Sequence, residues 1–213
     1  LGVPAYALSV RNHEGSRVLS ADEYRQTGIE HYVDDIATVL DWIGEPAVLI
    51  GHSLGGLMVQ KAAEDRDVVA VACIGSASPA GVGPTRDFTW DEDEPLMFDR
   101  ARMRGAMFEE IDDATFEAIY SRLVPESTRA LNQSGLAGVD VDPAKITAPM
   151  IFLGTAHDGV GLHPAEKLAS FFDAEHMTVP GTSHDVLLED SGLRVAAHIL
   201  GWLCRTVPGF LPR

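Results

Sequence analysis

Gly51-His52-Ser53-Leu54-Gly55-Gly56 directly follows the apolar run Ala47–Ile50. A short and wholly apolar run of this kind is typical of a central strand that is buried on both faces. Ser53 has glycine two residues before it and two residues after it, as in a sharp turn that joins a strand to a helix. In such a turn the neighbouring backbone comes too close for side chains, and the serine hydroxyl points above the sheet. The stretch therefore predicts that Ser53 is an exposed nucleophile.

The residues after Ser53 predict a helix over Leu54–Ala63. The first backbone N–H groups of a helix have no partner inside it, and the helix dipole makes that end favourable for negative charge. We therefore expect the N–H of Leu54 to help hold an oxyanion that forms beside Ser53.

The rest of the chain alternates short apolar runs with amphipathic helical patterns. Apolar residues at three- and four-residue steps from Ile29 to Ile43 indicate one helix, and Gly44 is its expected stop. A second helix is predicted from about Ser191, with Val195, Ile199, Trp202 and Leu203 turned inward. This alternation predicts an α/β fold, with a mainly parallel sheet and helices on both faces. The predicted strands are Val3–Val10, Ala47–Ile50, Val68–Ile74, Ala148–Leu153 and His176–Val179.

The segment 84–143 has a different character. It begins with an acidic cluster at 91–94 and continues with two apolar helical stripes, the second after a helix cap at Asp112 or Asp113. We expect a helical lid over a pocket, inserted into a core formed by residues 1–83 and 144–213. The same apolar side chains could equally serve to pack this segment onto the core. The stripes contain Met97, Phe98, Met103, Met107, Phe108, Phe116, Ile119, Tyr120 and Leu123.

Composition limits the classes of partner. The chain has 213 residues, with 32 acidic and 16 basic side chains and a formal net charge of -16. Such a surface repels phosphate backbones, so nucleic acid is not an expected partner. No apolar run approaches the roughly 20 residues that span a bilayer, and we expect a cytoplasmic protein unless a signal precedes Leu1. The cysteines, Cys73 and Cys204, lie in apolar runs and are interpreted as buried free thiols, although a disulfide stays open.

Taken together, these patterns resemble the α/β-hydrolase superfamily along nearly the whole chain. The Ser53 turn matches the family's nucleophile elbow fully. Residues 9–16, Ser-Val-Arg-Asn-His-Glu-Gly-Ser, are similar to the family's Asp-Leu-Arg-Gly-His-Gly-x-Ser turn. Arg11, His13 and Ser16 match that turn, whereas Ser9, Asn12 and Glu14 depart from it.

A serine hydroxyl needs a neighbouring base, and histidine suits this role because its pKa lies near neutral pH. Of eight histidines, only His184 follows the last predicted strand in a loop of turn residues, Val-Pro-Gly-Thr-Ser-His-Asp at 179–185. This loop resembles the family's Pro-Gly-x-x-His segment. His31 is interpreted as solvated, His52 as structural, and His198 as having no evident role.

The base should in turn be oriented by a carboxylate. Asp158 is the one acid at the end of the predicted strand Ala148–Leu153 and its following turn, and the turn at 75–79 contains none. Family members place this acid about three residues past the glycine that corresponds to Gly154, whereas Asp158 lies four past it, so one residue is inserted here. The order Ser53, Asp158, His184 is the one expected on this fold. His157, Asp158 and His163 lack the spacing of a zinc motif, so no metal is expected.

One expected part is missing. In the family, the second oxyanion donor follows a strand that lies between the first strand here and Ala47–Ile50. Three explanations stay open, and we favour the first, that residues precede Leu1 in the natural protein. In the second, Val3–Val10 pairs directly with Ala47–Ile50, and Asn12 or the backbone near His13 acts as the oxyanion donor. In the third, the protein binds a ligand without turnover. N-terminal strands are thus expected to be missing from the sequence.

The resemblance implies a serine hydrolase that cleaves a carboxylic ester or related acyl bond through an acyl-enzyme. No cofactor is implied, and the substrate is expected to be a small molecule with an apolar acyl group. An acyltransferase, thioesterase or C–C hydrolase would use the same residues, and a non-catalytic binding protein would retain the fold. The sequence does not indicate the oligomeric state.

Overall fold

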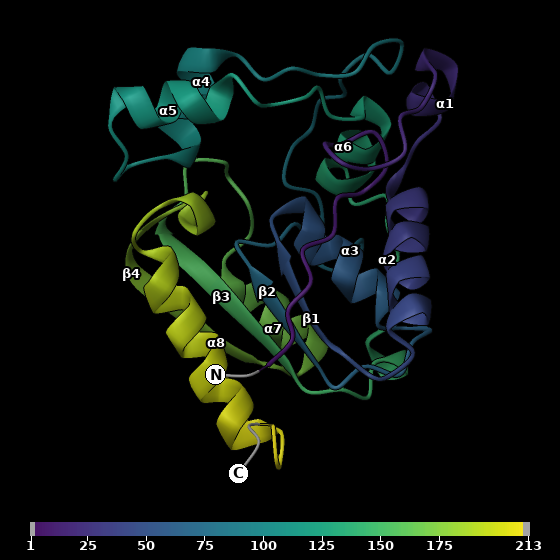
Figure 1. The fold of residues 1–213 in the computed structure, drawn as a ribbon, viewed down its shortest axis with the longest axis vertical. Coiled ribbons are helices and arrows are strands. Elements are labelled where there is room, and N and C mark those ends of the chain that lie inside the picture. Colours follow the sequence, from purple (N-terminus) through teal and green to yellow (C-terminus); the bar gives the residue numbers. More distant parts are fainter. Residues whose placement is uncertain (1–2, 211–213) are drawn as a thin grey trace.

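Four parallel strands form one sheet, in the order β1-β2-β3-β4, within residues 3–210, which the computed structural model describes (Figure 1). Because each strand pairs in parallel with the next, every connection must cross over one face of the sheet. This architecture confirms the predicted α/β class. The strands are β1 (Val48–His52), β2 (Ala70–Ile74), β3 (Met150–His157) and β4 (Glu175–Ser183).

The helices begin and end where local chemistry allows. Gly44 ends α2 in the left-handed conformation, with φ 73°, as predicted. The side chain of Asp99 caps α4, and that of Asp112 caps α5 by accepting a hydrogen bond from the N–H of Thr115. The helices are α1 (Ala21–Arg25), α2 (Ile29–Ile43), α3 (Leu54–Ala62), α4 (Arg100–Met107), α5 (Asp113–Tyr120), α6 (Thr128–Gly135), α7 (Ala165–Phe172) and α8 (Gly192–Thr206), with short 3-10 turns at Pro143–Lys145 and Val186–Leu188.

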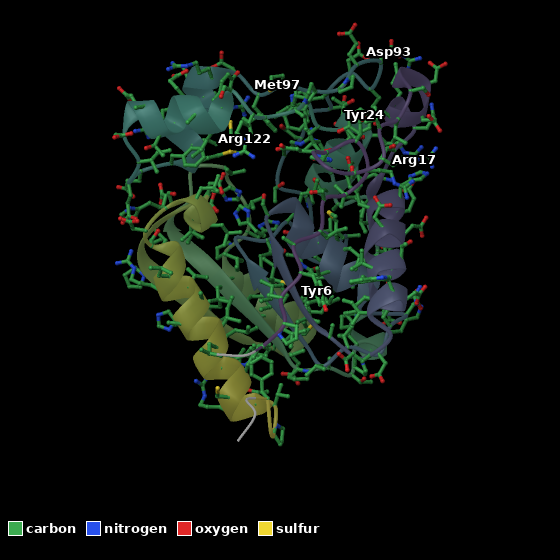
Figure 2. The ribbon with its side chains drawn as sticks, viewed as in Figure 1. Tyr6, Arg17, Tyr24, Asp93, Met97 and Arg122 are labelled. Atoms are coloured by element: carbon green, nitrogen blue, oxygen red, sulfur yellow. The ribbon has the colours of Figure 1, made fainter. Side chains whose placement is uncertain are left out.

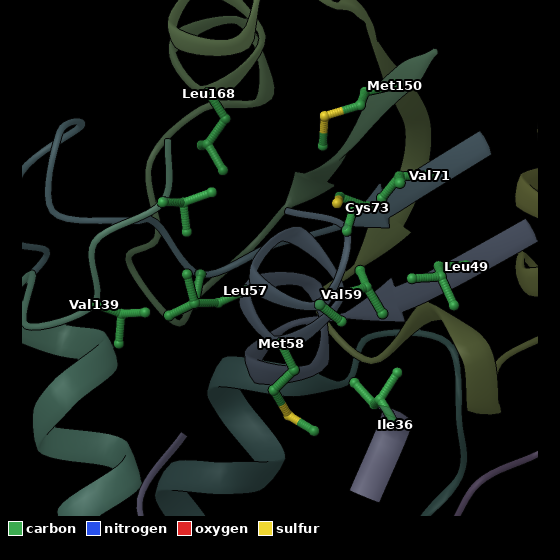
Figure 3. Packing of buried hydrophobic residues seen from close by; sticks show 14 of the residues in the cluster. Ile36, Leu49, Leu57, Met58, Val59, Val71, Cys73, Val139, Met150 and Leu168 are labelled. Atoms are coloured by element: carbon green, nitrogen blue, oxygen red, sulfur yellow. The ribbon is translucent and has the colours of Figure 1, made fainter. Parts of the chain in front are cut away.

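The side chains of each strand alternate between two apolar layers. On one face of the sheet, Val71 and Cys73 of β2 pack with α2, α3 and α7, and Figure 3 shows this layer with Leu57 and Val59 of α3. On the other face, the remaining residues of β2 pack against α8. The inward residues of α8 are Val195, Ile199, Trp202 and Leu203, as predicted.

The prediction of a strand at Val3–Val10 is wrong. This segment crosses the sheet in extended form without joining it, and Figure 2 shows Tyr6 on this course. An apolar, alternating sequence can be extended without being a strand, because a strand also needs a neighbour to which its backbone bonds.

The prediction that the run Ala47–Ile50 is a central strand is also wrong. Its strand, β1, lies at the edge of the sheet, and the side chain of Ile50 is 54% exposed. Ile50 lines an open apolar groove of about 420 Å³ beside α8. A fully apolar run predicted burial on both faces, but the α8 face of β1 is only partly covered.

The segment after β2 divides into two parts. An isolated antiparallel bridge between Leu96 and Glu126 closes an excursion that contains α4 and α5, which lie together beyond the end of the sheet (Figure 1). Met103, Phe108 and Phe116 form the buried cluster of this pair. The sequence did not predict α6, the third helix of this segment. It packs against α2 and α3 rather than with α4 and α5.

The structure also bears on the expectations about membrane-spanning segments and about the two cysteines. No helix among residues 3–210 is long and apolar enough to cross a membrane. Both cysteines are free thiols, but only Cys73 is buried. The expectation of burial is wrong for Cys204, because its position on α8 turns it away from the core to the exposed side of the helix.

Candidate active site

Ser53 lies in the turn between β1 and α3 with an unusual backbone. Its φ is 53° and its ψ is −120°, a conformation that residues with side chains rarely adopt. Two backbone hydrogen bonds hold it there: the N–H of Ser53 donates to the carbonyl of Ile74 at 2.9 Å, and the N–H of Ala77 donates to the carbonyl of Ser53 at 2.9 Å. The turn is therefore fixed by the end of the neighbouring strand β2.

The glycines around Ser53 do not all serve the same purpose. A Cβ added to Gly51 would lie 2.3 Å from the carbonyl oxygen of Gly55, and one added to Gly56 would lie 2.2 Å from the hydroxyl of Ser76. A Cβ on Gly55 would meet nothing within 4 Å. Close packing thus requires glycine at 51 and 56, whereas at 55 it does not.

We expect Gly51→Ala to lower the free energy of unfolding by about 1–3 kcal/mol, because its Cβ would push against a backbone carbonyl that cannot move independently. Gly55→Ala is the matched control, and its stability should stay within about 1 kcal/mol of the wild type. Urea denaturation measures both. Equal stability of the two variants would contradict the packing shown by the turn.

A chain of hydrogen bonds connects three predicted residues. Nε2 of His184 lies 2.9 Å from Oγ of Ser53, and Nδ1 of His184 lies 2.7 Å from Oδ2 of Asp158. Ser53 follows β1, Asp158 follows β3 and His184 follows β4, so the carboxyl ends of parallel strands bring them together. The side chain of His184 is 1% exposed, which shields its bond to Asp158 from water.

The pairing of β3 with β4 is irregular just before Asp158 and His184. From Thr155 to His157 β3 advances by two residues, whereas β4 advances by four, from Val179 to Ser183, so the surplus residues form a bulge in β4. The hydroxyl of Thr155 donates to Oδ2 of Asp158 at 3.0 Å, and the N–H of Val160 donates to Oδ1 at 2.9 Å. Burial alone would raise the pKa of Asp158, but the hydrogen bond and charge of His184, with these two donors, lower it.

His52 supports the backbone of the His184 loop. Its Nε2 donates to the carbonyl of His184 at 2.8 Å, and the two rings lie 4.9 Å apart. Burial, followed by the charge of His184, lowers the pKa of His52 to about 4. At neutral pH His52 is therefore an uncharged donor, in line with the structural role predicted for it.

Leu54 is the first residue of α3, so its N–H has no acceptor within the helix. The alternative oxyanion donors predicted from the sequence lie elsewhere. Asn12 accepts a hydrogen bond from the N–H of Leu19 at 3.2 Å, and the His13 ring faces Glu126 at 3.4 Å. Within the described residues, no hydrogen bond joins Asn12 or His13 to Ser53, and the direct pairing of Val3–Val10 with β1 does not form.

The loop at residues 11–16 instead anchors the excursion. Arg11 forms an ion pair with Asp35 of α2 at 2.7 Å. His13 faces Glu126, at the end of the excursion, and the hydroxyl of Tyr32 donates to that same carboxylate at 2.5 Å. The hydroxyl of Tyr24, which Figure 2 shows near α6, donates to the carbonyl of the preceding Pro125 at 2.8 Å. Nothing in the local sequence marked Glu126, because its partners lie about a hundred positions away.

The pair of His13 and Glu126 predicts a pH-dependent stability. The hydrogen bond to Glu126 outweighs burial and raises the pKa of His13, while hydrogen bonds from His13 and Tyr32 outweigh burial and lower the pKa of Glu126. The stabilisation from His13 is thus fully present below its unfolded pKa and is lost as pH rises through its folded pKa. The part from Glu126 is lost only at strongly acid pH.

His13→Gln should therefore cost about 1 kcal/mol of unfolding free energy at pH 5.5 and much less at pH 8.5. His198→Gln, on the exposed side of α8, serves as the matched control. Urea denaturation at the two pH values measures the difference. A loss for His13→Gln that is greater at pH 8.5 would have the wrong sign for this ion pair.

A cavity of about 460 Å³ adjoins Asp158 on the side of α7, but neither Ser53 nor His184 lines it. The hydrogen bonds, rather than this cavity, therefore locate the candidate site. Among residues 3–210, no three His, Cys, Asp or Glu side chains converge as metal ligands. His157 contacts Glu109, while His163 contacts the carbonyl of Gly83, so these two histidines point to different partners.

Comparisons with known proteins agree with this fold. Residues 1–198 match the model of a family described as the alpha/beta hydrolase family. No curated protein matches the chain in sequence. Among solved structures, an extracellular alpha/beta-hydrolase from a Paenibacillus species is 14% identical with a TM-score of 0.69, and the match covers 92% of this chain and 86% of that one.

Two further solved structures are similar. A methylesterase from Arabidopsis is 16% identical with a TM-score of 0.69, over 92% of this chain and 85% of its own. An esterase from Thermogutta terrifontis is 18% identical with a TM-score of 0.64, over 93% of this chain and 78% of its own. At these identities the likeness shows the fold alone.

Proposed function

The chain belongs to the alpha/beta hydrolase family, and on this basis we propose that it is a serine hydrolase that cleaves a carboxylic ester or a related acyl bond. The proposal rests on one observation, the hydrogen-bonded series from Ser53 through His184 to Asp158. Two of the similar structures are an esterase and a methylesterase, which supports an ester as the substrate class.

In the proposed reaction, Nε2 of His184 takes the proton of the Ser53 hydroxyl as the oxygen attacks the substrate carbonyl. Asp158 accepts the Nδ1–H of His184, which holds the ring in the tautomer that leaves Nε2 free to accept. The N–H of Leu54 donates to the oxyanion. His184 then returns the proton to the leaving alcohol, and water releases the acyl group by the same steps in reverse.

We also propose that the predicted insertion 84–143 supplies a lid over this site through its excursion at 96–126, whereas α6 belongs to the core. The excursion with α4 and α5 lies beyond the carboxyl ends of the strands, where Ser53, Asp158 and His184 also lie (Figure 1). Its methionine and aromatic side chains suit a small substrate with an apolar acyl group. Arg122, two residues after the end of α5, pairs with Glu14 at 3.2 Å, so the lid also contacts the loop at 11–16.

A fluorescent phosphonate that labels activated serines tests the proposal directly. We expect rapid labelling of the wild type, with the adduct on Ser53 by peptide mass spectrometry, because the nearby imidazole activates only this hydroxyl. Heat-denatured protein should not react. Labelling of His184→Ala should be slower by a factor of about 10⁴ or more.

The absence of a Ser53 adduct in folded protein would overturn the proposal. If Ser53 is labelled but no chromogenic ester is hydrolysed, Ser53 remains the proposed nucleophile and the ester is rejected as the substrate class. Acyl chains of increasing length, compared by kcat/KM, then define the apolar subsite.

A further inference from the structure

The C-terminal end of α4 is bound to both loops that follow β3 and β4. The N–H of Gly159, next to Asp158, donates to the carbonyl of Ala106 at 3.1 Å. The N–H of Asp185, next to His184, donates to the carbonyl of Met107 at 2.8 Å. The lid is thus bonded to residues directly adjacent to both members of the imidazole–carboxylate pair.

One buried carboxylate strengthens this junction. Glu189 is 7% exposed, and its Oε1 accepts hydrogen bonds from the N–H groups of Glu109 at 2.8 Å and Glu110 at 3.0 Å. Its Oε2 accepts the hydroxyl proton of Ser183, the residue before His184, at 2.7 Å. A single side chain therefore joins the lid to the strand end that carries His184.

The charge of this carboxylate is itself held in place by its donors. Burial would raise the pKa of Glu189, but hydrogen bonds from the backbone of Glu110 and Glu109 and from Ser183 lower it. An ionised carboxylate forms stronger hydrogen bonds than a neutral group, and a buried N–H left without an acceptor destabilises the structure. The junction therefore favours a docked lid.

We infer that Glu189 is a positioning residue of the hydrolase. By binding both Ser183 and the turn at residues 109–110 of the lid, it keeps the imidazole of His184 aligned between Asp158 and Ser53. The inference rests on the proposed function and extends it, because it links the position of the lid to the rate of the chemical step. Displacement of a catalytic group by about 1 Å is enough to lower a rate by about a hundredfold.

The experiment compares Glu189→Ala with Glu189→Gln, and Glu45→Ala serves as a control because Glu45 is exposed and makes no hydrogen bond within residues 3–210. Rates are divided by the number of sites that the phosphonate titrates, so unfolded protein does not count. We expect Glu189→Ala to lower kcat per titrated site by about 10- to 100-fold with KM within about threefold. Glu189→Gln should recover most of the rate, because its amide oxygen can still accept from the lid and its NH₂ can donate to Ser183.

A second variant covers the case in which Glu189→Ala does not fold. Ser183→Ala removes the hydroxyl that reaches Glu189 and leaves both backbone bonds to the lid, and kcat per titrated site should fall several-fold. In Ser183→Ala and in any folded Glu189→Ala, the low-field proton resonance of the His184 Nδ1–H should shift or broaden, whereas a merely structural role would reduce the titrated fraction and leave the resonance unchanged.

The outcomes separate the two claims. If the wild type shows no Ser53 adduct, the proposed function fails. If the wild type is labelled but the Glu189 and Ser183 variants match Glu45→Ala in kcat per site and in the low-field resonance, the positioning role is wrong and the hydrolase proposal stands.

Discussion

Replacing Ser53 with alanine is expected to abolish ester hydrolysis, with kcat falling by about 10⁶-fold. The expected loss is this large because the other two residues act only through the hydroxyl: His184 has no proton to take, and Asp158 then orients a ring that has no function. Hydrolysis of a chromogenic ester by Ser53→Ala, measured over hours at high enzyme concentration, gives the residual rate.

Two controls make this result specific. Ser121→Ala replaces an exposed serine and should keep full activity. The melting temperature of Ser53→Ala should remain that of a folded protein, because the turn is held by backbone bonds to Ile74 and Ala77 rather than by the hydroxyl. Turnover by Ser53→Ala at more than about a hundredth of the wild-type rate would mean that another group is the nucleophile.

Asp158→Asn is expected to lower kcat by about 10⁴-fold while leaving the fold intact. The amide that replaces the Oδ2 position would donate rather than accept, so His184 would favour the tautomer whose Nε2 carries the proton. In that tautomer Nε2 cannot accept the proton of Ser53. Steady-state kinetics at neutral pH measure the loss.

The matched control for Asp158→Asn is Asp190→Asn, at an exposed aspartate six residues after His184 in the sequence. It loses the same charge without contacting His184, and its kcat should be within about twofold of the wild type, as for most surface substitutions. Similar losses in the two variants would show that net charge, rather than the tautomer of the imidazole, controls the rate.

Features with a local pattern could be predicted from the sequence. The helix from Ile29 to Ile43 and its stop at Gly44 follow from apolar spacing and from the freedom of glycine in the left-handed region. The turn at Ser53 combines tight backbone approach with a following helix, which short-range residue types reveal. The catalytic roles of Ser53, Asp158 and His184 stay predictions, although the structure brings the three side chains together.

Features that depend on distant partners could not be predicted. Val3–Val10 has strand-like residues, but nothing in them tells whether a neighbouring strand exists. The helix α6 was missed because part of its buried side is polar: Thr128 and Asn132 are buried, with partners in the loop between β2 and α4. Glu126 and Glu189 look like ordinary surface acids in the sequence, since the donors that bury them include groups from segments about 80 to 94 residues away.

The bulge in β4 holds extra chain length directly before His184. An added residue in a regular strand would turn every later side chain to the opposite face. Opposite the step from Thr155 to His157, the surplus in β4 is two residues, an even number, so Ser183 pairs with His157 again and the imidazole of His184 still faces Asp158. A change of this surplus by one residue would reverse the side on which the imidazole lies.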